Sequence, residues 1–251
     1  MHSKLTIFDM TIPSYGAMVL LGAFVVTVLG IVISWWKKLQ VFQFLKLELW
    51  SGLAAIIGSK LWYLMTNTYK NYEQDITLNS FLDSGYSSYG GIVFGMSTAY
   101  IVAKILRLDF EIYAKNLIFL VPLFHAFWKF GCYMGGCCYG IKYSGVGTIT
   151  FPEGVKAPAG IPLFPVQLLE VMILVMLSIM FFIRGITKLN RPVVKYVGWY
   201  TSLRFITDFF RQHSNNELLS VAQKISIVCC LSIILWHVFE KRKIKIWRKH
   251  I

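Results

Sequence analysis

The length of its apolar runs is the feature that most limits how this chain can fold. They recur from one end of the sequence to the other, and hydrophobic residues make up 56% of its 251 positions. A helix needs about 20 mostly apolar residues to cross the hydrocarbon core of a bilayer. Soluble proteins rarely combine that composition with runs of that length. The sequence therefore predicts an all-α, polytopic membrane protein.

Seven segments qualify as candidate membrane spans, which predicts a seven-helix bundle. Their expected bounds are about 16–36, 48–66, 88–106, 116–138, 166–184, 193–211 and 221–240. Basic residues follow the first, third, fifth and seventh spans, so the N-terminus is expected outside and the C-terminus in the cytoplasm. We find no linker or internal repeat and expect one integral membrane domain over residues 1–251.

Charge and cysteine content exclude several classes of protein. The net charge is +13, but the lysines and arginines lie mainly between the spans, where cytoplasmic loops are expected to be basic. We therefore expect no nucleic-acid partner. The five cysteines do not form the even, regular set of a disulfide framework. The first span lacks a cleavable signal pattern and is expected to remain in the protein.

The span over 193–211 carries an unusual polar stripe. Tyr200, Arg204, Asp208 and Arg211 would fall within roughly 80° of one another on a continuous helix. Charged side chains inside a membrane helix usually face the protein interior. An Arg204–Asp208 pair that only neutralises itself is one interpretation. The surplus positive charge favours the other, a site for an anionic phosphate, which arginine can bind through two hydrogen bonds.

Other polar residues are expected at the same outer depth of the membrane. Gln167 and Glu170 open the span over 166–184, where a carboxylate near a helix N-terminus is stabilised without any function. Glu170 could instead pair with an arginine or accept a proton. The remaining candidates have an ordinary explanation as interfacial side chains or close-packed glycines: Tyr15, Lys60, Tyr89, Gly90 and Gly91.

The stretch from His125 to Gly140 is rich in glycine and cysteine. Glycines at this density weaken a helix and allow close backbone approach. Three interpretations of its cysteines stay open, namely a metal site, a functional thiol and simple packing of a small apolar residue. The C-x4-C-C spacing differs from the C-x2-C of common zinc sites, so no metal is expected. The candidate residues here are His125, Lys129, Gly131, Cys132, Gly136, Cys137 and Cys138.

At this point the sequence resembles the prolipoprotein diacylglyceryl transferase family. The similarity extends over nearly the whole chain through spaced anchors. They are Ser14-Tyr15-Gly16, Tyr89-Gly90-Gly91, the segment from Pro122 to Gly136, Pro165 to Glu170, and Tyr200 to Arg211. Each anchor is short, but their order and their placement on seven spans identify the chain as similar to this family.

Departures from the family signature mark a divergent branch. Lys129 replaces the signature arginine, which keeps the charge but loses the planar fork of the guanidinium. Cys132 stands in place of an asparagine and Cys137 in place of a glutamate. Tyr89 occupies a position where some family members have histidine, and Phe164 stands in place of the histidine before the proline.

The resemblance implies a reaction in the bacterial inner membrane with its active site toward the extracytoplasmic side. Diacylglyceryl would pass from phosphatidylglycerol, or a related phospholipid, to the acceptor cysteine thiol of a secreted lipoprotein precursor, with release of glycerol phosphate. No cofactor is implied. The expected catalytic residues are Arg204, Glu170, Lys129, Tyr200, Asp208, Cys132 and Cys137. The expected substrate-binding residues are Tyr15, Tyr89, Gly90, Gly91, His125, Gly131, Gly136, Cys138, Gln167, Arg211 and Lys60.

Two alternatives accompany this hypothesis. A paralogue could use a different acceptor, or its thiols Cys132, Cys137 and Cys138 could modify lipid directly. A chain with seven spans could also be a transporter or receptor. Against that class, the sequence has no inverted repeat and its polar residues gather at one depth.

Overall fold

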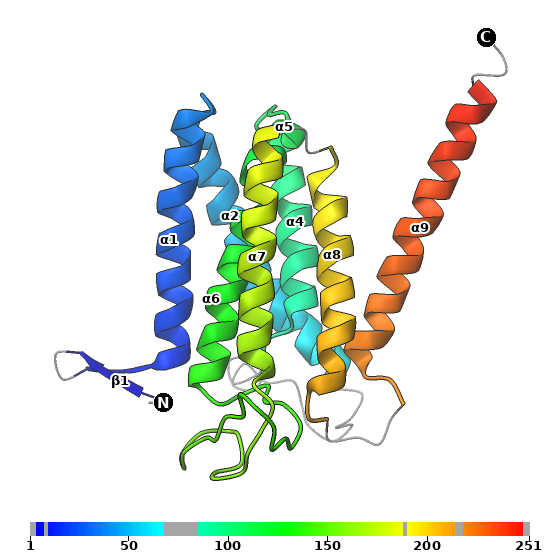
Figure 1. The fold of residues 1–251 in the computed structure, drawn as a ribbon. Helices are drawn as coiled ribbons and strands as arrows, with labels where there is room; N and C mark the ends of the chain where they lie inside the picture. Colours follow the sequence, from blue (N-terminus) through cyan, green and yellow to red (C-terminus); the bar gives the residue numbers. More distant parts are fainter. Residues whose placement is uncertain (1–3, 8–9, 68–84, 188–189, 214–217, 248–251) are drawn as a thin grey trace. The chain divides into compact units, whose positions relative to one another are not determined.

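The computed structural model describes residues 4–7, 10–67, 85–187, 190–213 and 218–247, and it is built mainly from helices (Figure 1). The chain divides into two compact units. The first unit comprises Met1–Val26 and Ala114–Ile251, and the second comprises Thr27–Tyr113. All seven expected segments contain helix, so the prediction of a helical membrane protein is confirmed at that level.

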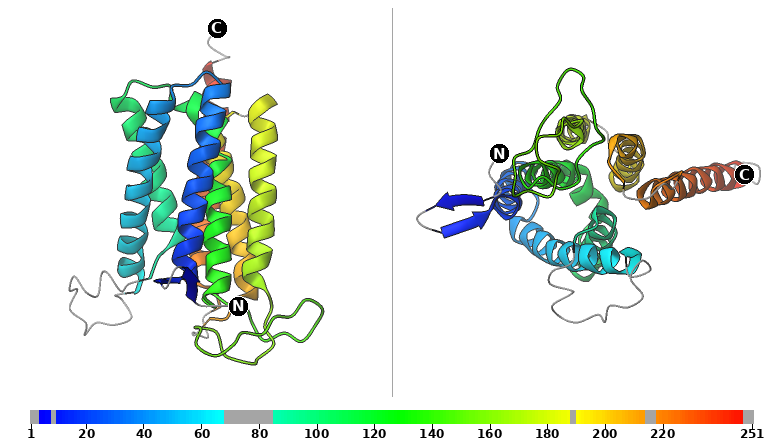
Figure 2. Two further views of the ribbon diagram at one scale, coloured as in Figure 1. Left: turned by 90° about the vertical axis from the view of Figure 1, so that its left-hand side faces the viewer. Right: turned by 90° about the horizontal axis from the view of Figure 1, so that it is seen from below.

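The first unit begins with a small hairpin. Its antiparallel strands are β1 (Lys4–Ile7) and β2 (Met10–Pro13). Helices α1 (Ser14–Trp36) and α5 (Phe110–Leu117) each contain a boundary between the two units. The elements wholly within the first unit follow in the order α6 (Leu120–Met134), α7 (Val166–Thr187), α8 (Pro192–Thr207), the 3-10 turn η2 (Asp208–Phe210) and α9 (Val221–Trp247). Helix α7 packs against α6 and also touches α8, while α9 packs on α8 and runs out to its side (Figure 2).

The span expected over 116–138 is not one straight helix. The chain forms α5 and α6, which are bent by 48° at the break between them. Pro122 explains the break, because proline cannot donate the backbone hydrogen bond that a continuous helix would make to the carbonyl of Ile118. Helix α6 ends at Met134, so Cys137 and Cys138 lie beyond the helix.

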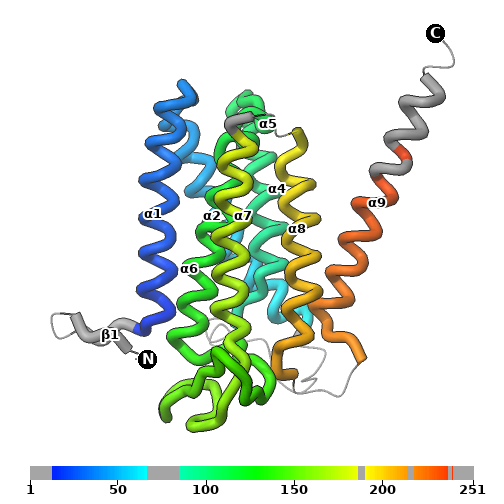
Figure 3. Tube along the Cα trace, in the orientation of Figure 1, coloured from blue at the N-terminus to red at the C-terminus, as the bar shows by residue number. Residues whose placement is uncertain are grey.

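The segment between α6 and α7 folds into a lobe at the ends of these helices (Figure 3). Isolated bridges join Lys142 and Ile149 to Leu163. Leu163 also belongs to a small buried cluster with Phe151 and Ala157. This lobe therefore has a core of its own, and it holds the turn that carries Cys137 and Cys138 in a defined position.

The second unit is organised by the close packing of α2 (Val41–Asn67) against α4 (Ser88–Ile105). A Cβ atom on Gly90 would overlap the carbonyl oxygen of Gly58 and the side chain of Trp62. One on Gly95 would lie 3.1 Å from Cβ of Ala55. Small residues thus let the two backbones approach closely, as is common between membrane helices.

Three described helices are long and apolar enough to cross a membrane: Ser14–Trp36, Val41–Thr66 and Val166–Gly185. The bent pair α5 and α6 adds a fourth if it counts as one span. Helices α4, α8 and α9 fall outside this group, and the apolar part of α9 is the shorter stretch Val221–Trp236. The structure thus supports a membrane protein with several spans.

Candidate active site

A chain of buried ion pairs joins three helices of the first unit. Nζ of Lys129, on α6, lies 2.7 Å from Oε2 of Glu170, on α7. Oε1 of Glu170 lies 3.0 Å from Nη1 of Arg204, on α8, and Nη2 of Arg204 lies 2.8 Å from Oδ1 of Asp208. All four residues are at most 9% exposed. Four of the predicted catalytic residues therefore converge in one network.

The order of charges along this network explains how it can exist inside the protein. Two cations alternate with two carboxylates, so each buried charge has a partner of opposite sign. Arg204 and Asp208 are one helical turn apart, which is the spacing at which side chains on a helix meet. Thr207 donates a hydrogen bond of 3.3 Å to Oε1 of Glu170. The sequence analysis named Glu170 as a possible partner for an arginine, but no pattern in the sequence indicated the contact with Thr207.

Within the described part of the chain, the Nε donor of Arg204 is free for a ligand. Its two Nη atoms bind Glu170 and Asp208, whereas its Nε is buried and has no hydrogen-bond partner among the described residues. The ammonium of Lys129 carries three protons, of which a single carboxylate oxygen uses one. The network can therefore offer hydrogen-bond donors to an anion without giving up its internal pairs.

The predicted position of Arg211 on the helical stripe is wrong. Helix α8 ends at Thr207, and Arg211 is extended after the turn η2. Its Nη2 donates a hydrogen bond of 3.4 Å to the carbonyl of Cys138. Arg211 therefore brings a third cation toward the cysteine turn instead of lying in line with Arg204.

Asp208 also binds residues that sequence reasoning missed. The hydroxyl of Ser220 donates to its Oδ2, and Nε2 of His213 lies 3.2 Å from the same oxygen. Ser220 precedes α9 and accepts a hydrogen bond from the backbone N–H of Gln223. Asp208 thus ties the end of α8 to the start of α9. No local pattern in the sequence indicates these contacts, because they join different elements.

Two aromatic residues lie one turn before the cations. His125 precedes Lys129 on α6, and Tyr200 precedes Arg204 on α8. Their ring centroids are 5.2 Å apart, and both side chains are buried. Tyr196 stacks on Tyr200 with centroids 6.0 Å apart. The structure therefore brings the predicted residues His125 and Tyr200 together beside the ion pairs.

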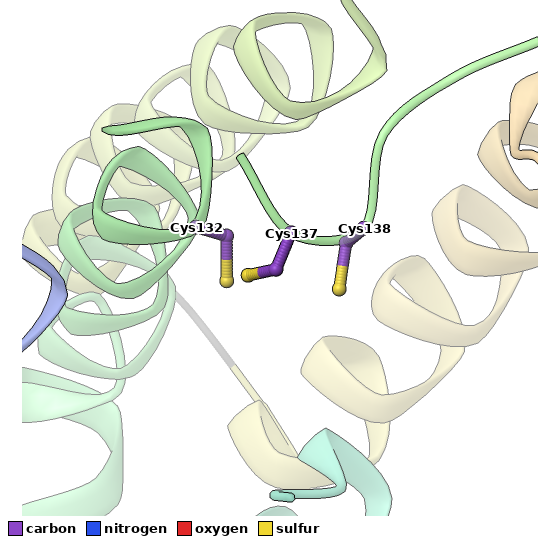
Figure 4. A group of neighbouring side chains, drawn as sticks. All are labelled: Cys132, Cys137 and Cys138. Carbon is purple, nitrogen blue, oxygen red and sulfur yellow. The ribbon is translucent and has the colours of Figure 1, made fainter. Parts of the chain in front are cut away.

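The three cysteines of the central stretch form a thiol cluster, defined here as Cys132, Cys137 and Cys138. Their sulfur atoms all lie within 4.8 Å of one another. The side chains of Cys132 and Cys137 point toward each other, with Cys138 next along the turn (Figure 4). Cys132 is buried, Cys137 is half-buried and Cys138 is exposed. In the turn outside α6, hydrogen bonds with the other two thiols lower the pKa of Cys138 well below its usual value.

A Schellman motif at the end of α6 brings these thiols together. The N–H of Cys137 bonds to the carbonyl of Cys132 at 3.0 Å, and the N–H of Gly136 bonds to that of Tyr133 at 3.2 Å. Gly136 has the positive φ of 63° that this motif requires. The predicted residue Gly136 therefore acts through the backbone, by turning the chain so that Cys137 returns to Cys132.

Side chains from α7 and α1 hold this region in place. The predicted residue Gln167 is fully buried and donates a hydrogen bond of 3.0 Å to the carbonyl of Cys137. A Cβ atom on Gly131 would lie 3.1 Å from the carbonyl oxygen of Tyr15. The ring of Tyr15 meets Trp128 edge to face, with centroids 6.1 Å apart. Gly131 thus permits close contact between α6 and the start of α1.

Four predicted residues belong to the second unit. Gly90 is required by the packing of α4 on α2, whereas a Cβ atom on Gly91 would meet its nearest neighbour at 3.5 Å. Tyr89 is buried. Nζ of Lys60 lies over the ring of Tyr86, 4.7 Å from its centroid, so it makes a cation–π contact. Their part in substrate binding stays a prediction.

Comparison with known proteins agrees with the resemblance noted in the sequence. The family model described as prolipoprotein diacylglyceryl transferase matches residues 3–239. A relative from Clostridium perfringens named phosphatidylglycerol–prolipoprotein diacylglyceryl transferase 2 is 28% identical over 250 residues, with 94% of each chain covered. A Clostridium tetani relative named phosphatidylglycerol–prolipoprotein diacylglyceryl transferase is 26% identical over 242 residues, covering 94% of this chain and 97% of its own. This chain belongs to the prolipoprotein diacylglyceryl transferase family.

Proposed function

We propose that this protein transfers the diacylglyceryl group of phosphatidylglycerol to the cysteine thiol of a prolipoprotein. A thioether forms and glycerol phosphate is released. The observation that carries this proposal is the buried network of Lys129, Glu170, Arg204 and Asp208, in a chain that belongs to the transferase family. Family membership also favours a transferase over a transporter or receptor.

Lys129, Arg204 and Arg211 stabilise the phosphate that leaves. Breaking the carbon–oxygen bond of the glyceryl group puts negative charge on that phosphate. Cations fixed in a water-poor site stabilise such charge without having to reorganise. Arg204 is central, because its Nη atoms are already held by two carboxylates while Nε stays free of partners among the described residues. Tyr15 and Gln167 help to orient the substrates.

Glu170 and Asp208 act mainly as positioning residues in this proposal. Each carboxylate is shared between partners: Glu170 between Lys129 and Arg204, and Asp208 among Arg204, Ser220 and His213. Glu170, held by two cations, is a weak acceptor for a thiol proton because the cations stabilise its charged form, and both oxygens of Asp208 are already engaged by Arg204, Ser220 and His213. The remaining predicted acceptors of that proton are Tyr200 and the thiol cluster.

We further propose a seven-span topology in the bacterial inner membrane, as one integral domain over residues 1–251. Basic residues after alternate spans support an outer N-terminus and a cytoplasmic C-terminus. With that orientation, the start of α7 and the end of α8 face the extracytoplasmic side, where secreted precursors are met. The predicted roles of Tyr89, Gly90, Gly91 and Lys60 remain part of this proposal.

The test uses the full chain in detergent micelles with acyl-labelled phosphatidylglycerol and a synthetic lipobox peptide. Arg204→Ala is expected to lower transfer roughly 100-fold or more, because a stabiliser of developing charge is lost. The control is Arg184→Ala, which removes an arginine at the other end of α7 and should leave the rate of transfer unchanged. Transfer by Arg204→Ala at the normal rate would show that the phosphate proposal is wrong.

A cellular test addresses the acceptor. The chain is expressed in bacteria depleted of their own diacylglyceryl transferase. Rescue of growth and of lipoprotein lipidation is expected. Correct membrane insertion without rescue would contradict a prolipoprotein acceptor.

A further inference from the structure

The thiol cluster has the composition of a metal site. Three thiol sulfurs lie within 4.8 Å of one another, and Cys132, Cys137 and Cys138 are all free thiols. Packing alone accounts for the first two, because the Schellman motif ordinarily brings an apolar pair together at these positions. It does not account for the third. Cys138 takes a positive φ of 60°, which is strained for a residue other than glycine, and its sulfur lies within 4.8 Å of the other two.

The geometry suits a tetrahedral metal with one position left open. A Zn–S bond of about 2.3 Å sets sulfur–sulfur separations of about 3.8 Å, so a small contraction of the cluster is enough. Thiolates are soft ligands that select zinc over magnesium or calcium. Three protein ligands leave the fourth position for water or substrate, which is the arrangement of catalytic zinc sites. Cys138 is exposed, so that position can be reached from outside the protein.

Residues around the thiol cluster hold its cysteines in position, as the outer-shell partners of metal ligands do. Gln167 fixes the backbone of Cys137 through its carbonyl, and Arg211 contacts the carbonyl of Cys138. Three thiolates and one Zn²⁺ carry a net negative charge. Arg211 offsets that charge, as does Lys129, which lies one turn before Cys132 on α6.

We propose that Cys132, Cys137 and Cys138 hold a Zn²⁺ ion whose fourth position binds the thiol of the acceptor cysteine. This inference rests on the proposed transferase function. Zinc would remove the need for a carboxylate to take the proton of the acceptor thiol, because Glu170 and Asp208 are both engaged in ion pairs. A zinc-bound thiol is deprotonated at neutral pH and remains a nucleophile.

The chemical step balances with these groups. The acceptor thiol loses its proton to water as it binds, and its sulfur then attacks the glyceryl carbon that carries the phosphate. The sulfur–carbon bond forms as the carbon–oxygen bond breaks. The electron pair leaves on the phosphate oxygen, and glycerol phosphate departs beside Arg204. Overall, a thiol and phosphatidylglycerol give a thioether and glycerol phosphate, with no oxidant or reductant.

Metal content of the purified, reduced full chain is the first test, with Zn²⁺ itself as the probe. About one zinc per chain is expected, with about three sulfur ligands at about 2.3 Å by X-ray absorption. The triple variant Cys132→Ser, Cys137→Ser, Cys138→Ser lacks all three ligands and is expected to hold roughly a tenth or less of the zinc of the native chain. The matched control is Cys229→Ser with Cys230→Ser, which removes two thiols from α9 and should keep the zinc.

Two results of this test would overturn the proposal. One is a reduced chain without zinc. The other is a mass increase by a diacylglyceryl group on one of the three cysteines, which would make the cluster a lipid carrier. If the triple variant fails to fold, Cys138→Ser alone replaces it, because that side chain is exposed. It too is expected to lose most of the zinc.

Transfer measured against pH is the second test. Without zinc, the acceptor must ionise by itself, and a thiol with a pKa of about 8.5 is only about 3% ionised at pH 7. Transfer by the triple variant should therefore fall roughly 30-fold at pH 7 and recover as the pH approaches that pKa. A purely structural role would lower the rate equally at every pH and would overturn the activation role. Zinc binding without any transfer would instead refute the transferase function and leave the metal site standing. Full transfer by the triple variant would leave the transferase function standing and overturn the role of the zinc in activating the acceptor thiol.

Discussion

Glu170 and Lys129 form a buried ion pair between helices α7 and α6, with 2.7 Å between Oε2 and Nζ. The other oxygen of the same carboxylate pairs with Arg204. Glu170 is therefore the only residue of the four-membered network that links two cations from two different neighbouring helices. Its removal should disturb both the fold and the site.

Replacing Glu170 by glutamine is expected to destabilise the protein by about 3 kcal/mol, because two buried cations lose their shared partner. Transfer should fall as well, since Lys129 and Arg204 then repel each other. Thermal unfolding in detergent micelles and the peptide assay measure the two effects. Glu153→Gln is the control, because Glu153 is exposed on the lobe. Equal unfolding temperatures for the two variants would contradict the structural role of Glu170.

Lys129 can be tested by restoring the arginine of the family signature. Lys129→Arg is expected to keep the pair with Glu170 and to lower the KM for phosphatidylglycerol roughly threefold or more, because a guanidinium can give a phosphate two hydrogen bonds. Lys129→Met removes the charge at similar length and should lower transfer roughly 100-fold. Normal transfer by Lys129→Met would exclude a role in phosphate binding.

The turn after α6 offers a matched pair of glycines. Gly136→Ala would place a Cβ atom 2.7 Å from Cβ of Val155 at a φ of 63°, whereas Gly147→Ala has a φ of 80° and no neighbour within 4 Å. Both carry a backbone cost of about 1–2 kcal/mol. Only Gly136→Ala should also separate Cys137 from Cys132. Its unfolding temperature and zinc content are expected to fall below those of Gly147→Ala. Identical behaviour would contradict the role of the Schellman motif.

Single substitutions can separate the roles of the two glycines in the Tyr89-Gly90-Gly91 anchor. Gly90→Ala is expected to cost about 1–3 kcal/mol, because the added atom overlaps α2. Gly91→Ala should be tolerated, since its nearest contact would be 3.5 Å. Yield and thermal unfolding of the two variants provide the comparison. If Gly91→Ala kept its stability but lost transfer, Gly91 would have a direct part in substrate binding.

Membrane orientation can be read by labelling single cysteines in a chain whose five native cysteines are serine. Val146→Cys on the lobe, where Val146 is 99% exposed, should react with an impermeant maleimide in intact cells. Asn190→Cys, between α7 and α8, should react only after the cells are opened. The reverse pattern would show that the proposed orientation is wrong.

Much of the fold was predictable because its causes are local. Runs of apolar residues indicate the positions of the helices in all seven expected segments, and the low apolarity of 88–106 and 193–211 is evident from their residues alone. The break before α6 was missed, although Pro122 could have indicated it. The end of α8 at Thr207 was missed because nothing in the sequence marks it.

The residues of the candidate site could be predicted from the sequence, but only some of the contacts between them could. Lys129, Glu170, Arg204 and Asp208 stood out as charges within apolar segments. The Arg204–Asp208 pair follows from helical spacing. Ser220 and His213 could not be found, because polar residues in loops are common and their contacts with Asp208 are tertiary.

By itself, the sequence determined that this chain is a helical membrane protein, because hydrophobicity acts on each segment separately. It also determined which charged side chains must be buried away from lipid, because the cost of burying a charge is a property of each segment. Only the tertiary structure decided that Glu170 pairs with two cations and that three thiols meet at the end of α6. The spacing C-x4-C-C does not by itself predict that meeting, which depends on the turn at Gly136 that folds the chain back. Distances across helices and turns depend on packing, which spacing along the chain does not encode.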